Sequence, residues 1–173
     1  MFALLLLLVA ASHPPALPVF HSADEIFDAV RASRHPTVVH FWATWCRTCL
    51  DELPEVRRLA KGLEGSGADL LFVSLDDPRK SEKVAKFMKD KGLLSTRQAR
   101  GALLEAEDPG PVTARFDAKW TAQLPATFFL LESGTTVASH LGPTPVDAVL
   151  AEVRAHAGNT EAALPEPHVA KPH

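Results

Sequence analysis

The sequence predicts an α/β fold in which a mixed central sheet carries helices on both faces. Apolar segments typical of buried strands alternate with amphipathic helical patterns along most of the chain, and alternation of this kind favours parallel pairing. Two strands joined by a tight turn follow near the end, and they add antiparallel strands to the sheet. The expected order is β-α-β-α-(β)-β-β-α within 173 residues, a length that suits one domain with additional segments at both ends.

The composition excludes several functional classes. Hydrophobic residues make up 46% of the chain, enough for a real core, and the formal net charge is only -3. Without a basic surplus, nucleic acid and anionic membrane surfaces are not expected partners. There are two cysteines, three positions apart, whereas a small secreted protein held together by disulfides needs more at wider spacing.

The first segments of the chain are typical of export. Met1–Ala11 is an apolar run that ends in small residues, and it is shorter than a transmembrane helix requires. We therefore expect residues 1–12 to form a signal peptide or a short anchor, and the proline-containing residues 13–21 to form a linker. The alternative is a buried N-terminal helix, which the uniform leucines without a polar face disfavour.

The first half of the domain contains well-marked elements. Ser22 and Glu25 have the spacing of a capping box, which predicts a short helix after them. Residues 37–43 are β-branched and aromatic and predict a buried strand. A leucine and valine stripe over residues 50–63 predicts a helix, which Pro54 should kink.

The middle of the chain alternates strong and weak signals. Residues 69–75 predict a second buried strand, and residues 80–91 an amphipathic helix with lysines outward. Residues 93–120 are the least regular stretch, in which 101–106 are a candidate strand and 108–111 a turn.

The last elements are a hairpin and a helix. Residues 126–131 and 135–141 predict its two strands. Thr144 is a candidate N-cap for a final helix with an inward stripe of valines and leucine. From Gly158 the periodicity stops, so we expect residues 159–173 to form a disordered tail.

The chemistry is concentrated in Trp45-Cys46-Arg47-Thr48-Cys49, where a strand ends and a helix begins. Unpaired N–H groups and the helix dipole favour a thiolate at that point, and Arg47 adds a positive charge. The spacing puts the two sulfurs within disulfide reach. Cys46 should be the exposed attacking thiol and Cys49 the resolving one.

Other functions of a Cys-x-x-Cys pair fit less well. A structural zinc site needs four ligands, and the chain has no third cysteine. Covalent haem attachment needs His after the second cysteine, where Leu50 stands. Two cysteines without a function remain a weak alternative. We expect no metal site.

At this point the sequence resembles a known family. Phe41–Cys49 is similar to the active-site segment of the thioredoxin superfamily, and Gln123–Phe128 to its second fixed element, a cis-proline that opens the next strand. Gly142 matches a family glycine after the hairpin. The resemblance implies a thioredoxin-like three-layer fold over residues 19–158 and a redox-active Cys46–Cys49 disulfide.

The long separation between Cys49 and Pro125, an insertion before the cis-proline strand, resembles the exported TlpA/ResA-like branch, as does Glu52-Leu53-Pro54. The resemblance implies action on protein thiols and disulfides outside the cytoplasm, in a bacterial periplasm or after secretion, with or without an uncleaved N-terminal tether. It implies a recycling redox partner, such as a membrane electron donor. We expect no cofactor and a monomer.

The resemblance also implies residues that bind substrate. Pro125 would lie against the cysteines and leave the backbone of Leu124 free to pair with an extended chain, although Pro125 could also simply mark a strand edge. Trp45 would form an exposed apolar rim beside Arg47. Trp120 would either line the groove or pack in the core.

Two further residues are candidates for proton transfer. Glu52 could take the proton of Cys49, or it could be a solvated acid early in a helix. His40 stands where the family commonly has Asp or Asn, on the strand beneath the cysteines. A neutral imidazole there could relay the same proton, or it could be a hydrogen-bonded core histidine.

The predicted function is thiol–disulfide oxidoreduction on protein disulfides, as a reductant. An oxidant or isomerase would use the same chemistry, so the direction stays open. A binding module that keeps the fold without catalysis is an alternative from another class. A thiol peroxidase is disfavoured, because a cysteine pair replaces the lone peroxidatic cysteine of that family.

Overall fold

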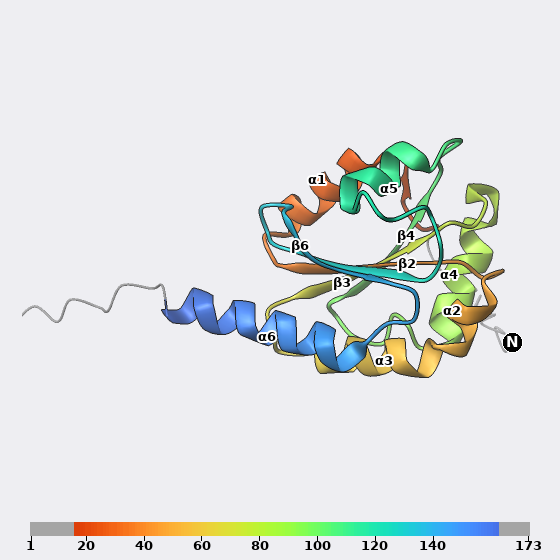
Figure 1. Cartoon of the computed structure of the whole chain (residues 1–173). Helices are drawn as coiled ribbons and strands as arrows, with labels where there is room; N and C mark the ends of the chain where they lie inside the picture. Colours follow the sequence, from red (N-terminus) through yellow and green to blue (C-terminus); the bar gives the residue numbers. More distant parts are fainter. Residues whose placement is uncertain (1–15, 163–173) are drawn as a thin grey trace, which may run out of the picture.

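The computed structural model describes residues 16–162, with side chains as far as residue 157, and contains a sheet between two layers of helices (Figure 1). The six strands lie in the order β1-β4-β3-β2-β5-β6. The first four of these are mutually parallel, β5 is antiparallel to its neighbour β2, and β6 is antiparallel to β5, so that only β5 runs against the other five strands. The strands are β1 (Val19–Phe20), β2 (Thr37–Trp42), β3 (Asp69–Ser74), β4 (Ala99–Leu104), β5 (Ala126–Leu130) and β6 (Thr136–Leu141). The predicted mixed sheet and thioredoxin-like layers are confirmed.

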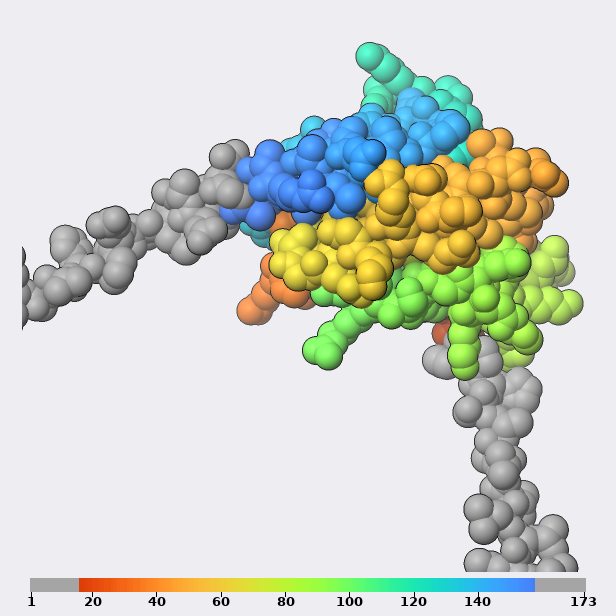
Figure 2. Space-filling view, turned by 90° about the horizontal axis from the view of Figure 1, so that it is seen from below, coloured from red at the N-terminus to blue at the C-terminus, as the bar shows by residue number. Residues whose placement is uncertain are grey.

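Helices cover both faces of this sheet. α1 and α5 lie on one face, and α3, α4 and α6 on the other, where Figure 2 shows them from outside. α2 continues from the end of β2 into α3. The helices are α1 (Ala23–Ser33), α2 (Arg47–Asp51), α3 (Leu53–Gly62), the 3-10 turn η1 (Pro78–Lys80), α4 (Ser81–Asp90), α5 (Gly110–Phe116) and α6 (Val146–Ala162).

The central strand β2 is buried along its whole length and divides the core in two. Its side chains alternate between the faces. Val39 and Phe41 pack into the cluster under α1 and α5, while Val38 and Trp42 pack into the cluster under α3, α4 and α6. His40 therefore faces the second cluster, the one that also contains Cys46 and Cys49.

Two elements were missed by the sequence analysis. Val19 and Phe20, expected in the linker, form β1 by pairing with Leu103 and Leu104 of β4. Two residues carry too little periodicity to reveal a strand that a distant partner defines. The second missed element is α5, which follows directly from the expected turn at 108–111. Pro111 lies in the first turn of that helix, where its missing N–H costs nothing.

Two helix boundaries also differ from the expectation. The helix after the cysteines is not one kinked element but two, which meet at Glu52, just before Pro54. α6 runs to Ala162 and so includes the first four residues of the expected tail. Alanine-rich sequence tolerates one glycine in a helix, at a cost of about 1 kcal/mol.

The expected signal peptide at residues 1–12 and most of the expected tail lie outside the described residues. Within residues 16–162, no helix is long and apolar enough to cross a membrane.

Candidate active site

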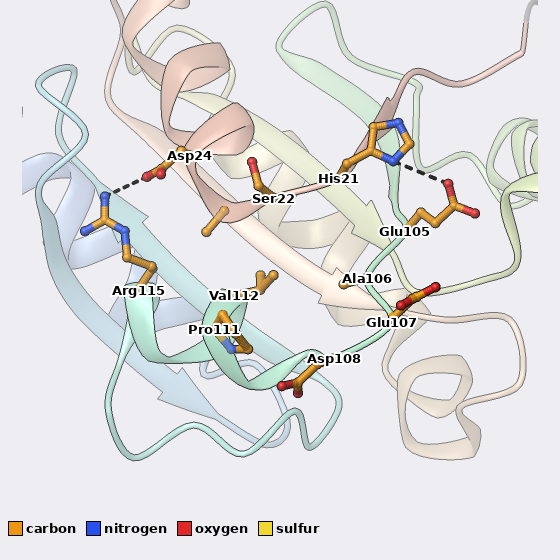
Figure 3. Close-up of a pocket in the computed structure, with 11 residues that line it drawn as sticks. His21, Ser22, Asp24, Glu105, Ala106, Glu107, Asp108, Pro111, Val112 and Arg115 are labelled. Carbon is orange, nitrogen blue, oxygen red and sulfur yellow. Dashed lines mark hydrogen bonds and ion pairs between the residues drawn. The ribbon is translucent and has the colours of Figure 1, made fainter.

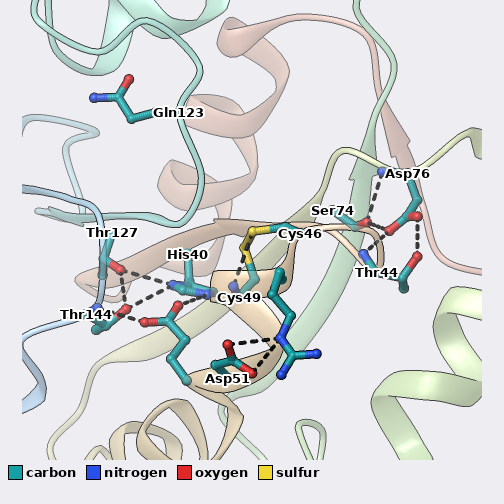
Figure 4. Close-up of a disulfide and its surroundings, with 12 residues drawn as sticks. His40, Thr44, Cys46, Cys49, Asp51, Ser74, Asp76, Gln123, Thr127 and Thr144 are labelled. Atoms are coloured by element: carbon teal, nitrogen blue, oxygen red, sulfur yellow. Dashed lines mark hydrogen bonds and ion pairs between the residues drawn. A yellow bond between two sulfur atoms is a disulfide. The ribbon is translucent and has the colours of Figure 1, made fainter.

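The two cysteines form a disulfide at the start of α2 (Figure 4). Their Cα atoms are 5.2 Å apart, as the three-residue spacing requires. Cys46 is the N-cap of α2, and its Sγ accepts a hydrogen bond of 3.2 Å from the backbone N–H of Cys49. Cys46 is 8% exposed and Cys49 2% exposed. Both are buried, so the predicted exposure of Cys46 is wrong in degree, although Cys46 is the more accessible sulfur-bearing residue of the pair.

Polar and apolar side chains surround the disulfide at the surface. Trp45 is 65% exposed, as predicted for a rim residue. The side chain of Arg47 is also exposed, and its Nε lies 3.0 Å from Asp51 Oδ1. The Leu124–Pro125 peptide bond is cis. Leu124 is partly buried and packs against the hydrophobic cluster that contains both cysteines.

His40 and Glu52 form a buried pair. They are 2% and 8% exposed, and His40 Nε2 lies 3.4 Å from Glu52 Oε1. Both side chains are thus inside the protein, and Glu52 is not the solvated acid that the sequence left open. The closeness of His40 to the sulfur of Cys49 stays a prediction.

Two threonines complete this polar group, and the sequence analysis did not single out either side chain for it. Thr127 Oγ1 of β5 lies 3.0 Å from His40 Nδ1 and 3.0 Å from Thr144 Oγ1. The backbone N–H of Thr144 donates to Glu52 Oε2 at 2.8 Å. We expected Thr144 to act as a helix N-cap; its hydroxyl lies in the site, beside Thr127.

Burial shifts the titration of both ionisable groups. It lowers the pKa of the His40 imidazole from 6.5 to about 3, so the ring is neutral at pH 7. Burial raises the pKa of the Glu52 carboxyl above its ordinary value, against the opposing effect of the hydrogen bonds from Thr144. The pair therefore contains a neutral base beside an acid that holds its proton more tightly than usual.

A second buried carboxylate lies on the other side of the disulfide in the view of Figure 4. Asp76, after β3, accepts hydrogen bonds from the N–H of Thr44 at 2.8 Å, from the Thr44 hydroxyl, and from the Ser74 hydroxyl at 2.7 Å. Since Thr44 precedes Cys46 by two residues, Asp76 fixes the loop that carries the first cysteine. The sequence indicated only a turn at Asp76-Asp77-Pro78, because Asp and Pro are common turn residues.

Trp120 does not line a substrate groove. It is 2% exposed and packs against Phe41, Phe116 and Phe128 under α5. An aromatic ring in such a cluster cannot touch a substrate. Its indole N–H donates to the backbone carbonyl of Gln123 at 2.8 Å, which anchors the loop that leads to Pro125 from inside.

A cavity lies apart from the cysteines. It has a volume of about 690 Å³ and lies between the start of α1 and residues 105–112 (Figure 3). His21 and Glu105 face each other across 3.3 Å there, and Arg115 donates to Asp24 at 2.8 Å. Neither cysteine lines it. Within the described residues, no group of three His, Cys, Asp or Glu side chains could hold a metal ion.

The geometry defines a class of protein: a thioredoxin-like fold with a disulfide-bonded cysteine pair at a strand-to-helix junction and a cis-proline just before β5. Residues 17–139 match the AhpC/TSA family, and the chain belongs to that family. Its fold is thioredoxin-like, and its cysteine pair stands at the start of α2.

One curated relative is thioredoxin 1 of Chlorobaculum tepidum, which is 31% identical over 65 residues. The match covers 38% of this chain and 61% of the relative, so it spans about three fifths of the relative's length.

Solved structures share the fold at low sequence identity. A thiol:disulfide interchange protein of the thioredoxin family from Chlorobium tepidum has a TM-score of 0.54 at 19% identity, over 86% of this chain and 99% of that one. A secreted thiol-disulfide isomerase from Corynebacterium glutamicum has a TM-score of 0.55 at 20% identity, over 72% of each chain.

Proposed function

We propose that this protein is a thiol–disulfide oxidoreductase that acts on protein disulfides through Cys46 and Cys49, as a reductant outside the cytoplasm. The observation that carries the proposal is the disulfide at the start of α2, with Trp45 exposed beside it and the N–H of Cys49 bonded to Cys46 Sγ. The same N–H would stabilise a Cys46 thiolate in the reduced protein, since a hydrogen bond to the charged form favours it.

The reaction proceeds by two exchanges. The Cys46 thiolate attacks one sulfur of a substrate disulfide, the substrate S–S bond breaks, and one substrate sulfur leaves as a thiolate. Cys49 then loses its proton and attacks Cys46 Sγ in the mixed disulfide. The second substrate sulfur leaves, and the Cys46–Cys49 disulfide seen in the structure forms. Two electrons pass from the cysteine pair to the substrate.

The proton of Cys49 goes to the buried pair of Glu52 and His40. The imidazole is neutral and can accept a proton, and Glu52 Oε1 faces it at 3.4 Å. A carboxyl with a raised pKa is a better proton acceptor near neutral pH than an ordinary one.

An extended substrate chain would bind beside the cis peptide. Trp45 supplies an exposed apolar surface, and the backbone of Leu124 supplies hydrogen-bonding groups. Arg47, exposed and next to Cys46, contributes a charge at this rim.

Reduction of insulin disulfides, driven by dithiothreitol, tests the activity. We expect the wild-type protein to accelerate insulin precipitation and Cys46→Ser to have no effect beyond the uncatalysed rate. A wild-type protein without activity would favour a non-catalytic binding module. Consumption of peroxide by the reduced protein in place of insulin reduction would favour a thiol peroxidase.

The direction of electron flow is tested by the reduction potential of the Cys46–Cys49 pair. We expect a value near about -270 mV, typical of a reductant, whereas a value near about -120 mV would make the protein an oxidant.

Export is supported by the apolar run Met1–Ala11 and by the secreted relative of known structure. We expect the mature protein from the native host to lack this run, as measured by mass spectrometry. An intact Met1 in soluble cytoplasmic protein would contradict export.

A further inference from the structure

Four polar side chains from four separate parts of the chain form a closed, buried group, which we call the proton ring: His40, Glu52, Thr127 and Thr144 (Figure 4). His40 belongs to β2, Thr127 to β5 and Thr144 to the segment before α6, while Glu52 joins α2 to α3. All four are buried, so their polar atoms must find partners within the ring.

The backbone restricts where Glu52 can hold a proton. The N–H of Thr144 donates to Oε2, which makes that oxygen an acceptor. Oε1 is buried, has no hydrogen bond, and lies 3.4 Å from His40 Nε2. A proton bound by Glu52 therefore sits on Oε1 and points at the imidazole.

Two proton arrangements satisfy the ring. When Glu52 is ionised, His40 carries its proton on Nε2 and donates to Oε1, so Nδ1 must accept a hydrogen bond from Thr127. When Glu52 is protonated, Oε1 donates to Nε2, and His40 carries its proton on Nδ1 and donates to Thr127 Oγ1. The imidazole is neutral in both, in keeping with its burial.

A hydroxyl can serve both arrangements at this place, because it donates in one and accepts in the other. Thr127 is held in position by the sheet, where it is the direct cross-strand partner of His40. Thr144 Oγ1, 3.0 Å away from Thr127 Oγ1, can exchange donor and acceptor roles with it. Thr144 itself lies 3.5 Å from Nδ1, the limit of a hydrogen bond.

We propose that Thr127 is a positioning residue whose hydroxyl lets the His40 imidazole move its proton from one ring nitrogen to the other when Glu52 takes up or releases a proton. The proposal rests on the proposed function, in which this pair accepts the proton of Cys49.

The step balances without any redox change. On uptake, one proton binds at Nδ1 and one passes from Nε2 to Glu52 Oε1, so the ring gains one proton and the carboxylate loses its charge. On release, the same transfers run in reverse.

Other elements also face the ring. β6 contributes His140, the cross-strand partner of Thr127, whose Nε2 lies 3.1 Å from Glu152 Oε2 of α6. β3 contributes the uncharged ring of Phe72, edge-on to His40 with 5.8 Å between ring centres. β5 and the segment before α6 contribute the two hydroxyls. In the reduced protein, Cys46, the N-cap of α2, and Cys49 add their thiols to the cluster that His40 faces.

Nitrogen-15 NMR of the histidine rings in the oxidised full-length protein tests the proposal. The His40 signals are assigned by comparison with His40→Gln, and spectra are recorded from about pH 4 to about pH 9. We expect Nδ1 to carry the proton at the acidic end and Nε2 at the basic end. Thr127→Ser, the matched control, should titrate like the wild type.

Thr127→Val removes the hydroxyl and keeps the shape of the side chain. A buried N–H without an acceptor is less well tolerated than a buried acceptor without a donor, so the variant should disfavour the proton on Nδ1. We expect the pH midpoint at which the His40 proton moves between Nε2 and Nδ1 to fall by about 0.5–1 pH unit. The pH profile of mixed-disulfide resolution should shift in the same direction.

Two results would overturn the proposal. One is a wild-type His40 that keeps the same protonated nitrogen across the whole pH range, which needs no Thr127 variant to observe. The other is a folded Thr127→Val that titrates like the wild type. Neither result depends on catalysis. If the protein failed to reduce insulin but the His40 proton still moved between the two ring nitrogens with pH, only the proposed function would be rejected.

Discussion

Cys46 and Cys49 differ in environment although both are buried. Cys46 Sγ accepts the N–H of Cys49, and the exposed Trp45 precedes it, while Cys49 lies in the first turn of α2. The hydrogen bond favours a thiolate at Cys46, which should therefore attack first. We predict that Cys49→Ser accumulates mixed disulfides with substrate proteins, detected by non-reducing electrophoresis and mass spectrometry.

The matched variant Cys46→Ser keeps the other thiol and should form no such adducts. If adducts accumulated on Cys49 of that variant and were absent from Cys49→Ser, the order of attack would be the reverse of the one proposed.

His40 should act in the second exchange only. The buried, neutral imidazole pairs with Glu52, and both would receive the proton that Cys49 must lose. We predict that His40→Ala slows resolution of the mixed disulfide by about 10²–10⁴-fold, the usual contribution of a positioned base, and leaves attack by Cys46 nearly intact. Stopped-flow exchange with a model disulfide separates the two steps, and His40→Asn controls for loss of volume. Unchanged resolution in folded His40→Ala would leave His40 a packing residue.

The sequence predicted the parts of the site that are local. The cysteine pair, the exposed Trp45 and the buried His40 follow from spacing and strand alternation within ten residues. Thr127 and Thr144 could not be found this way, since their contacts with His40 and Glu52 span 87 and 92 positions. Trp120 was ambiguous because an aromatic residue near a loop fits a groove and a core equally well.

At the scale of elements, the loop between β2 and α2 depends on the carboxylate that follows β3. Asp76 accepts three hydrogen bonds, two of them from Thr44 and one from Ser74. Asp76→Ala would leave these donors without a partner in a buried place. We predict a loss of about 2–4 kcal/mol in the free energy of unfolding, measured by urea denaturation, together with slower attack by Cys46.

Thr44 offers the graded comparison. Thr44→Val removes one hydroxyl donor and should cost about 1 kcal/mol, whereas Thr44→Ser keeps the donor and should cost much less. An Asp76→Ala protein as stable as the wild type would show that the carboxylate does not hold the loop.

Elements with a strong internal period were predicted well, and those defined by distant partners were not. β2, β3 and α4 carry continuous apolar or amphipathic patterns. β1 is two residues long and exists only through its pairing with β4. The separation of α2 from α3 depends on Glu52, whose carboxylate is fixed by the N–H of Thr144 from far along the chain.

At the scale of the whole molecule, burial of His40 under the helical layer makes stability depend on pH. The pKa of His40 is 6.5 in an unfolded chain and about 3 in the folded protein, so between these values the unfolded state binds more protons. The stabilisation is complete above pH 6.5 and is lost as the pH falls toward about 3. Glu52 acts in the opposite sense, because its pKa is raised on folding: between 4.5 and that raised value the folded state binds more protons.

We predict that the difference in unfolding free energy between the oxidised wild type and His40→Gln falls with decreasing pH. The slope should be about 1.4 kcal/mol per pH unit below pH 6.5, or roughly 2–3 kcal/mol by about pH 4.5. Glu52→Gln removes the opposing contribution, so it should lose stability on acidification more steeply than the wild type in the range just above pH 4.5. Urea denaturation at a series of pH values measures all three proteins under one protocol. If the difference in unfolding free energy between the wild type and His40→Gln stayed constant with pH, His40 would be as easily protonated in the folded protein as in the unfolded chain. It could not then be the neutral buried base that the second exchange requires.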